Sequence, residues 1–550
     1  MFSTMTCSVT LVGGIICVLD AYIFYLLAVA LSFNPLRSLP GPPVRGYLGN
    51  HLNLVLNAEI SPRAYELLTR KYGRTMRIRG FGLWDERLLT LDPVAIAHIL
   101  KNTAVYEKPL LSRRIINNLI GCGMLSAEGQ SYKRLRRVAT PAFSVYNMRA
   151  LVPHVFKKAQ QLTDRWLSIM KEHEDEGEYL NIDVCHWLSR ATFDVIGLAG
   201  LDYNFDAIQD ETNPLFIAYR DMFEKGLSQT SSLRTLVVGY FPFLNVIFRN
   251  RTVRRCQTVI RDITGRLILD RKQQLEEAAA LELPHSGRDL LSLLIKANTM
   301  QDVPPESRVS DGELLDSINT FIFAGSDTSS LAMTWTLLLL AKHPATQTRL
   351  RAELLSLGIF RHVDEMTEEE MQGFFASLAE LPFFHNIVRE SLRLIPPVHS
   401  SMRVATRTDT IPLKYTVRRK DGEATSIEVP KGTFIHIPVE GFNLDKDVWG
   451  DDSWDFNPDR WDNLPQRARE MPGLFSNILT FSAGPRSCIG FRFALIGVKT
   501  MLYFLIVNFV FEEAESKVVK HNTVLMRPYI SGRFHDGSQC PLRVSVYRSA

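Results

Sequence analysis

The chain has 550 residues, with 63 Lys and Arg against 59 Asp and Glu, so its formal net charge is +4. Hydrophobic residues make up 46% and charged residues 22%, a balance that excludes a disordered, collagen-like or polytopic membrane chain. So small a net charge gives no support for nucleic-acid binding. The seven cysteines are odd in number and scattered, which argues against a disulfide framework, and CxxC and HExxH motifs are missing.

The first predicted element is a membrane anchor at residues 1–33. Its apolar run, residues 9–33, holds one charge, Asp20, and exceeds the roughly 20 residues that span a bilayer. Basic residues follow the run and none precedes it, so the positive-inside rule predicts a body facing the cytoplasm. A removed signal sequence is the alternative. Residues 34–50, with four prolines, are interpreted as a stiff hinge.

The rest of the chain, residues 51–550, lacks linkers and repeats and is predicted to be one large, mainly α-helical body with small β-sheets. Polar stretches near 275–290, 361–372 and 414–428 are interpreted as surface loops or solvated helix ends. Apolar residues at three- and four-residue spacing predict helices at 151–174, 182–200, 251–280, 309–341, 381–394 and 488–511. Short β-like segments occur at 74–79, 87–91, 402–406, 433–438 and 541–547.

The most informative segment is FSAGPRSCIGFRFA, residues 481–494. Gly484 and Pro485 predict a tight turn, after which Cys488 stands at the start of a long apolar helix. The positive end of that helix favours a thiolate over a thiol. Gly490 leaves room for a flat ligand, and Arg486 could reach an anionic group beside the sulfur. A lone thiolate is poorly suited to zinc, but it suits heme iron, to which the porphyrin already gives four nitrogens.

The predicted helix at 309–341 opens with a capping-box pattern, Ser310 and Glu313. Small and polar residues, Ala324-Gly325-Ser326-Asp327-Thr328-Ser329, interrupt its apolar middle. Glycine there costs about 1 kcal/mol relative to alanine, which a flat ligand pressed against the helix would explain. Thr328 could bond to its own helix backbone, and Asp327 could supply protons. A helix–helix contact made by small residues is the alternative.

The loop Phe481-x-x-Gly484-x-Arg486-x-Cys488-x-Gly490 resembles the heme-binding loop of the cytochrome P450 family. The resemblance extends from about residue 36 to the C-terminus and implies heme b, with Cys488 as the axial thiolate ligand of its iron. Residues 324–329 resemble the family's oxygen-activation motif, which implies heme contact for Ala324 and Gly325 and proton delivery for Asp327 and Thr328.

Further family motifs imply further roles. Glu390-x-x-Arg393 and Arg460 would form a buried ion network behind the heme loop. The heme propionates would be bound by Arg136, with Tyr132 where relatives often have Trp or His, and by Arg403. Outward-facing Lys133, Arg134 and Arg137 could steer an acidic electron donor.

The resemblance therefore implies a membrane-anchored, fungal-like heme-thiolate monooxygenase of the endoplasmic reticulum. It would use O2 and a hydrophobic small molecule such as a terpenoid, fatty acid or aromatic. Without a flavin or dinucleotide motif in the chain, electrons would come from NADPH–cytochrome P450 reductase, with or without cytochrome b5. A heme-thiolate isomerase or dehydratase, and a membrane-tethered heme or lipid binding protein without turnover, are the alternatives. The substrate pocket would draw on segments 105–125, 211–245, 321–328, 398–402 and 528–532.

Overall fold

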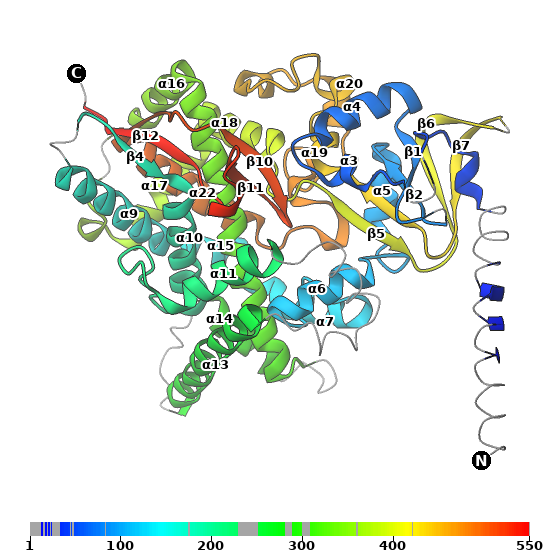
Figure 1. Cartoon of the computed structure of the whole chain (residues 1–550). Helices are drawn as coiled ribbons and strands as arrows, with labels where there is room; N and C mark the ends of the chain where they lie inside the picture. Colours follow the sequence, from blue (N-terminus) through cyan, green and yellow to red (C-terminus); the bar gives the residue numbers. More distant parts are fainter. Residues whose placement is uncertain are drawn as a thin grey trace. The chain divides into compact units, whose positions relative to one another are not determined.

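The structure is a computed structural model, and its elements are labelled in Figure 1. Most of the predicted anchor, residues 1–33, lies outside the residues that it describes. Among the described residues, one helix is long and apolar enough to cross a membrane, α22 (Phe491–Asn508), and 67% of it is buried inside the protein. The described ranges are 34–44, 49–82, 84–173, 177–228, 251–280, 289–299, 308–358, 361–420 and 422–548, with a few single positions before residue 47.

The chain divides into two compact units, residues 1–107 with 400–442 and residues 108–399 with 443–550. The first unit contains a five-stranded sheet in the order β1-β2-β8-β5-β3, in which β2 and β8 run parallel. Its strands are β1 (Thr75–Arg79), β2 (Glu86–Thr90), β3 (Tyr106–Glu107), β5 (Ser401–Ala405) and β8 (Phe434–Ile437). Its helices are α3 (Leu52–Leu56), α4 (Ser61–Tyr72), α5 (Pro93–Lys101) and most of α19 (Val439–Asn443).

A separate hairpin, β6 (Asp409–Arg419) with β7 (Gly422–Val429), completes the first unit. Asp92 ties the hairpin to the start of α5, because its carboxylate caps that helix and also accepts from the Lys414 N–H at 2.9 Å. The prediction of a loop or solvated helix end at 414–428 is therefore wrong. Few positions of the hairpin are buried, so the segment lacks the apolar alternation by which a strand is recognised.

The second unit is mainly helical, and two of its helices, α10 (Val184–Leu201) and α15 (Asp311–Lys342), pack along each other. Two small sheets belong to this unit, β4-β12-β9 and β10-β11. The strands are β4 (Leu180–Asp183), β9 (Phe509–Glu513), β10 (Val518–Thr523), β11 (Leu525–Ile530) and β12 (Pro541–Val546). The remaining helices are α6 (Leu110–Ile120), α7 (Gly129–Ala139), α8 (Val145–Ala150), α9 (Val152–Glu172), α11 (Pro214–Ser228), α13 (Arg251–Ala280), α14 (Leu290–Thr299), α16 (Pro344–Leu355), α17 (Glu368–Glu380), α18 (Pro382–Leu394), α20 (Lys446–Trp449) and α21 (Gln466–Arg469).

The mainly helical class with small sheets is confirmed, and each predicted long helix is present. The capping box at the start of α15 is also confirmed, since Ser310 and Glu313 each accept a hydrogen bond from the other's backbone N–H. The helix predicted to reach residue 511 ends at Asn508, where the chain enters β9 and pairs with β12. Apolar residues continue across that junction, so periodicity alone does not mark it.

Candidate functional site

The loop before α22 is wound into two short turns that place Cys488. Gly484 has φ +71°, a conformation that favours glycine, and opens a 3-10 turn that ends at Arg486. The Cys488 N–H donates to the Phe481 carbonyl at 3.0 Å, which closes the loop just before α22 begins at Phe491. The tight turn predicted from Gly484 and Pro485 is thus present.

The Cys488 side chain retains accessible surface although protein atoms surround it closely. Burial raises the pKa of the thiol, while a hydrogen bond from the Gly490 N–H and the charge of Arg136 act in the opposite direction. Burial is the largest of these three effects on the pKa of the thiol. Because metal coordination deprotonates a thiol outright, the thiolate form of Cys488 would depend on the bound ion.

Helix α7 and the cysteine loop are joined by three side chains. The Tyr132 hydroxyl donates to the Pro485 carbonyl at 2.9 Å, and Arg136 Nη1 donates to the Ser487 carbonyl at 2.8 Å. Arg486 donates to the Ala127 carbonyl at 2.9 Å and places its guanidinium 3.9 Å from the centre of the Tyr132 ring. The predicted residues of the loop and of α7 therefore lie together.

Glu128, which was not predicted from the sequence, adds a further contact between α7 and the cysteine loop. Its carboxylate forms an ion pair with Arg486, and both side chains are buried. Arg486 Nε is buried too and has no hydrogen-bond partner within the described part of the chain. Glu128 directly precedes the basic run of α7, so the only signal in the sequence was an acidic residue beside many basic ones.

Helix α15 is buried from Ser317 to Leu338 except at four partly accessible residues in its middle. These residues are Ala324, Gly325, Asp327 and Thr328. Thr328 Oγ1 donates to the Ala324 carbonyl at 2.6 Å, as predicted from the sequence.

Gly325 also serves packing between helices. A methyl group at Gly325 would come within 3.1 Å of Ile196 Cδ1 on α10 and 3.8 Å of the Phe493 ring on α22. The alternative interpretation, a helix–helix contact of small residues, therefore applies to this glycine. The same distances place the accessible stretch of α15 beside the first turn of α22, where the cysteine loop ends.

Asp327 lies on a different face of α15 from Thr328, and its carboxylate forms an ion pair with Arg527 of β11. Arg527 is buried, and its Nη1 also lies 3.8 Å from Glu224 Oε1 on α11. Burial opposes the charge of Arg527, but the two carboxylates raise its pKa overall. Neither Glu224 nor Arg527 carried a signal in the sequence, because their proximity to Asp327 arises only from the packing of α11, α15 and β11.

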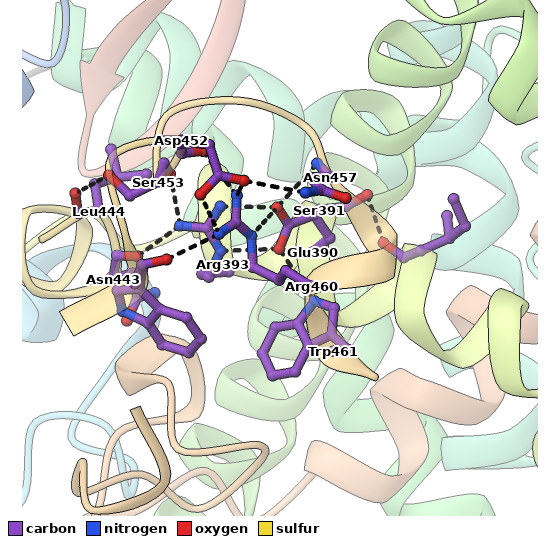
Figure 2. A network of polar contacts seen from close by, with 12 residues as sticks. Glu390, Ser391, Arg393, Asn443, Leu444, Asp452, Ser453, Asn457, Arg460 and Trp461 are labelled. Atoms are coloured by element: carbon purple, nitrogen blue, oxygen red, sulfur yellow. Dashed lines mark hydrogen bonds and ion pairs between the residues drawn. The ribbon is translucent and has the colours of Figure 1, made fainter. Parts of the chain in front are cut away.

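The ion network at Glu390 is shown in Figure 2. The Glu390 and Arg393 side chains are fully buried, and Arg460 is nearly so. Asp452, a second carboxylate not foreseen, accepts from Arg460 Nη2 at 2.9 Å. Glu390 accepts hydrogen bonds from Arg393 Nε (2.9 Å), Arg393 Nη2 (2.8 Å), Arg460 Nε (3.0 Å), the Asn457 N–H (3.1 Å) and Trp461 Nε1 (3.0 Å).

Arg403 lies in β5 of the first unit, whereas the cysteine loop belongs to the second. Its guanidinium donates to Ser401 Oγ at 2.7 Å and to the Met402 carbonyl at 2.8 Å. Of the segments expected to line the substrate pocket, residues 229–245 lie outside the described part.

The site in the second unit fits a flat ligand that carries anionic groups. A methyl group at Gly490 would meet only the Phe143 ring within 4 Å, at 3.6 Å, so protein packing does not require a glycine there. Arg486 Nε–H is a buried donor for which a carboxylate of the ligand would be a suitable acceptor. An accessible sulfur, a glycine beside it and an accessible stretch of α15 are what a heme bound through Cys488 needs.

Comparison with known proteins agrees with this class of site. The family model described as Cytochrome P450 matches residues 39–530. Cytochrome P450 monooxygenase 205 of Postia placenta is 35% identical over 95% of both chains, and monooxygenase 128 of the same fungus is 34% identical over 94% of this chain and 93% of its own. Ganoderic acid synthetase of Ganoderma lucidum is 30% identical over 92% of this chain and 94% of its own.

The chain belongs to the cytochrome P450 family, and it is a monooxygenase. Membership implies a heme iron with a cysteine thiolate ligand.

Proposed function

We propose that this enzyme inserts one atom of O2 into a hydrophobic small molecule, a terpenoid, a fatty acid or an aromatic compound. The observation that carries the proposal is the accessible Cys488 sulfur in a loop that ends beside the accessible stretch of α15. Heme b bound at this site would supply the oxygen chemistry, and a thiolate ligand favours O–O cleavage.

The chain's own residues would hold the cofactor and control protons. Cys488 would ligate the iron, and Phe481, Gly484 and Gly490 would shape the loop around it. Thr328 would pass protons toward the bound oxygen, and Asp327 would replace them. The residues that would contact the heme from the loop, α7, α15 and β5 are Arg486, Tyr132, Arg136, Ala324, Gly325 and Arg403.

Electrons would come from NADPH–cytochrome P450 reductase, with or without cytochrome b5, since the sequence has no flavin or dinucleotide motif. Residues 1–33 would anchor the protein in the endoplasmic reticulum membrane, and residues 34–50 would link the anchor to a cytoplasmic catalytic domain, residues 51–550. The length of the apolar run and the basic residues after it support this arrangement.

The test is the CO-difference spectrum of the dithionite-reduced protein beside Cys488→Ser and, as a matched control, Cys122→Ser. We expect a red-shifted, thiolate-type Soret band in the wild type and in Cys122→Ser, and its loss in Cys488→Ser. Heme bound without that band would mean another axial ligand, and a folded preparation without heme would refute the proposal. Substrate-dependent NADPH consumption with reductase then separates a monooxygenase from an isomerase, a dehydratase or a binding protein.

A further inference from the structure

A cavity of about 340 Å³ lies in the second unit on the side of α15 that carries Asp327. Its walls come from α10, α11, α15 and the C-terminal segment from Arg527 to Gln539. Charged side chains project into it, among them Glu224 and Arg527 beside Asp327. A polar space of this size has room for several water molecules, each with polar partners in the walls.

Arg527 lies between two carboxylates in this wall. Its Nη2 pairs with Asp327, its Nη1 lies 3.8 Å from Glu224, and its Nε is buried without a hydrogen-bond partner in the described part of the chain. One guanidinium facing two carboxylates leaves a net charge of −1 when both acids are ionised. Because these side chains have little access to solvent, a net charge on them is costly, and the group is more stable when it holds one proton.

Geometry and environment agree on where that proton lies at rest. Asp327 has the closer contact with Arg527, so it forms the stronger ion pair, and Glu224 is the better site for the shared proton. Burial raises the pKa of Glu224, and the charge of Arg527 opposes this effect. The other charged groups near it are Asp327, which adds to the rise, and Arg220 and Asp221 of its own helix, which oppose each other. Asp183, His186 and Asp536 line the same cavity.

We propose that Glu224 and Asp327 share one proton across Arg527, and that Glu224 supplies the proton that Asp327 passes to Thr328. This proposal rests on the proposed function of Asp327 and Thr328.

The transfer balances without any change of oxidation state. The O–H bond of the Glu224 carboxyl breaks and an O–H bond forms on Asp327, with water in the cavity as the carrier. Arg527 moves its ion pair from Asp327, now neutral, to the new Glu224 carboxylate. Asp327 gives this proton to Thr328, which passes one on toward the oxygen site, Glu224 takes a proton from solvent, and the resting pairing returns. Glu224 and Arg527 therefore act through Asp327 as positioning and supply residues.

The first test needs no turnover: pH-difference infrared spectra of the ferric protein, with Glu224→Gln and the control Asp221→Asn. Asp221 is on the same helix and pairs with Arg220 at 3.4 Å. We expect the C=O stretch of a protonated carboxyl in the wild type and in Asp221→Asn, and its absence in Glu224→Gln. A band that persists in Glu224→Gln would assign the proton elsewhere and overturn the proposal. Should that variant misfold, Glu224→Asp must keep the band at a shifted frequency.

The second test measures proton supply during turnover with reductase, NADPH and O2 alone, as the ratio of NADPH consumed to hydrogen peroxide formed. Peroxide uses one NADPH per O2, whereas full reduction to water uses two and needs more protons. We expect Glu224→Gln to raise the peroxide share by roughly tenfold, less than the 10²-fold or more that loss of a directly acting general acid costs. It should also raise the solvent isotope effect, while Asp221→Asn changes neither.

A double-mutant comparison distinguishes one proton route from two. Glu224→Gln combined with Asp327→Asn should yield no more peroxide than Asp327→Asn alone, because both changes interrupt the same route. Additive effects would refute the relay. The CO-difference spectrum separates this failure from failure of the proposed function. If the wild type lacks the thiolate-type band, the monooxygenase assignment fails, whereas an intact band with unaltered peroxide yield in Glu224→Gln refutes the proton store alone.

Discussion

Glu390 is a single, fully buried carboxylate that accepts hydrogen bonds from two arginines, an indole and a backbone N–H (Figure 2). The change Glu390→Gln would leave Arg393 and Arg460 buried without their shared anion. Breaking a buried pair from one side costs about 3–5 kcal/mol, so we expect a loss of that size in the free energy of unfolding. Urea unfolding of the ferric protein, followed by tryptophan fluorescence, measures it.

The matched control is Asp459→Asn. Asp459 also pairs with an arginine, Arg349, at 2.8 Å, but both side chains are more than half exposed. An exposed pair contributes about 0–1 kcal/mol, so the control should unfold nearly as the wild type does. Equal losses in the two variants would contradict a special role for the buried network.

At the residue scale, sequence patterns predicted which side chains would come together when the partners lie within one motif. Glu390 and Arg393 are three positions apart on a helix, and that spacing alone places them on one face. The partners supplied by tertiary packing were not predictable: Asp452 for Arg460, Glu128 for Arg486 and Arg527 for Asp327. Each is a charged residue whose partner lies on a different element, so no local spacing identifies it.

Helix α7 and the cysteine loop are held together by side-chain contacts. These contacts are the Glu128–Arg486 ion pair and the hydrogen bonds that Tyr132 and Arg136 donate to the loop. We expect Glu128→Gln to loosen the loop and to speed heme transfer to apomyoglobin by about an order of magnitude or more, since a broken buried pair costs several kcal/mol.

The control for this prediction is Glu313→Gln. Glu313 of α15 pairs with Arg134 of α7, but this pair is partly exposed and does not include a residue of the cysteine loop. Heme transfer from this variant should match the wild type. Faster transfer from both variants would show that α7 is destabilised as a whole. It would contradict a specific role of the Glu128–Arg486 ion pair in holding the heme.

The basic face of α7 is narrower than its sequence suggests. Arg134, expected to face outward, pairs with Glu313 and donates to the Arg308 carbonyl at 3.4 Å, whereas Lys133 and Arg137 are exposed. If this face guides an acidic electron donor, Lys133→Glu with Arg137→Glu should slow the first reduction of the iron by the reductase several-fold at low salt. The difference should shrink as ionic strength rises, because exposed charges are screened.

Stopped-flow reduction under CO measures this rate, and Lys101→Glu on α5 introduces one such charge reversal on another helix. A slowing that is independent of salt, or equal in the control, would contradict steering by α7. The periodicity that revealed the long helices could not reveal this detail, because it distinguishes apolar from polar positions but not paired from free charges.

At the scale of the whole molecule, the sequence suggested one continuous body, whereas the contacts separate two units. Residues 400–442 belong with residues 1–107, although 292 residues, 108–399, lie between them in the chain. These two segments form one unit because β5 and β8, from residues 400–442, lie in the same sheet as β1, β2 and β3. Strand pairing between distant segments depends on packing that no local pattern reports, so the sequence offered no boundary.

Lys499 links global stability to pH, because it lies buried in α22 of the second unit. Its Nζ donates to the Ala379 carbonyl at 2.7 Å, and burial, with the like charge of Arg389, lowers its pKa to about 8. In the unfolded chain the pKa returns to about 10.4. Between these values the unfolded state holds the proton and the folded state does not, so stability rises with pH across that window and the penalty is constant below it.

The size of the effect follows from the two pKa values, about 3 kcal/mol between pH 8 and pH 10.4. We expect the difference in unfolding free energy between the wild type and Lys499→Met to change by that amount across the window, in favour of the wild type as pH rises. Taking the difference cancels the titration of every other group that both proteins share. Lys431→Met, at an exposed lysine, should show no such trend. A flat difference for Lys499→Met would mean that Lys499 keeps its proton in the folded protein, held by Glu353 and the Ala379 carbonyl against the cost of burial.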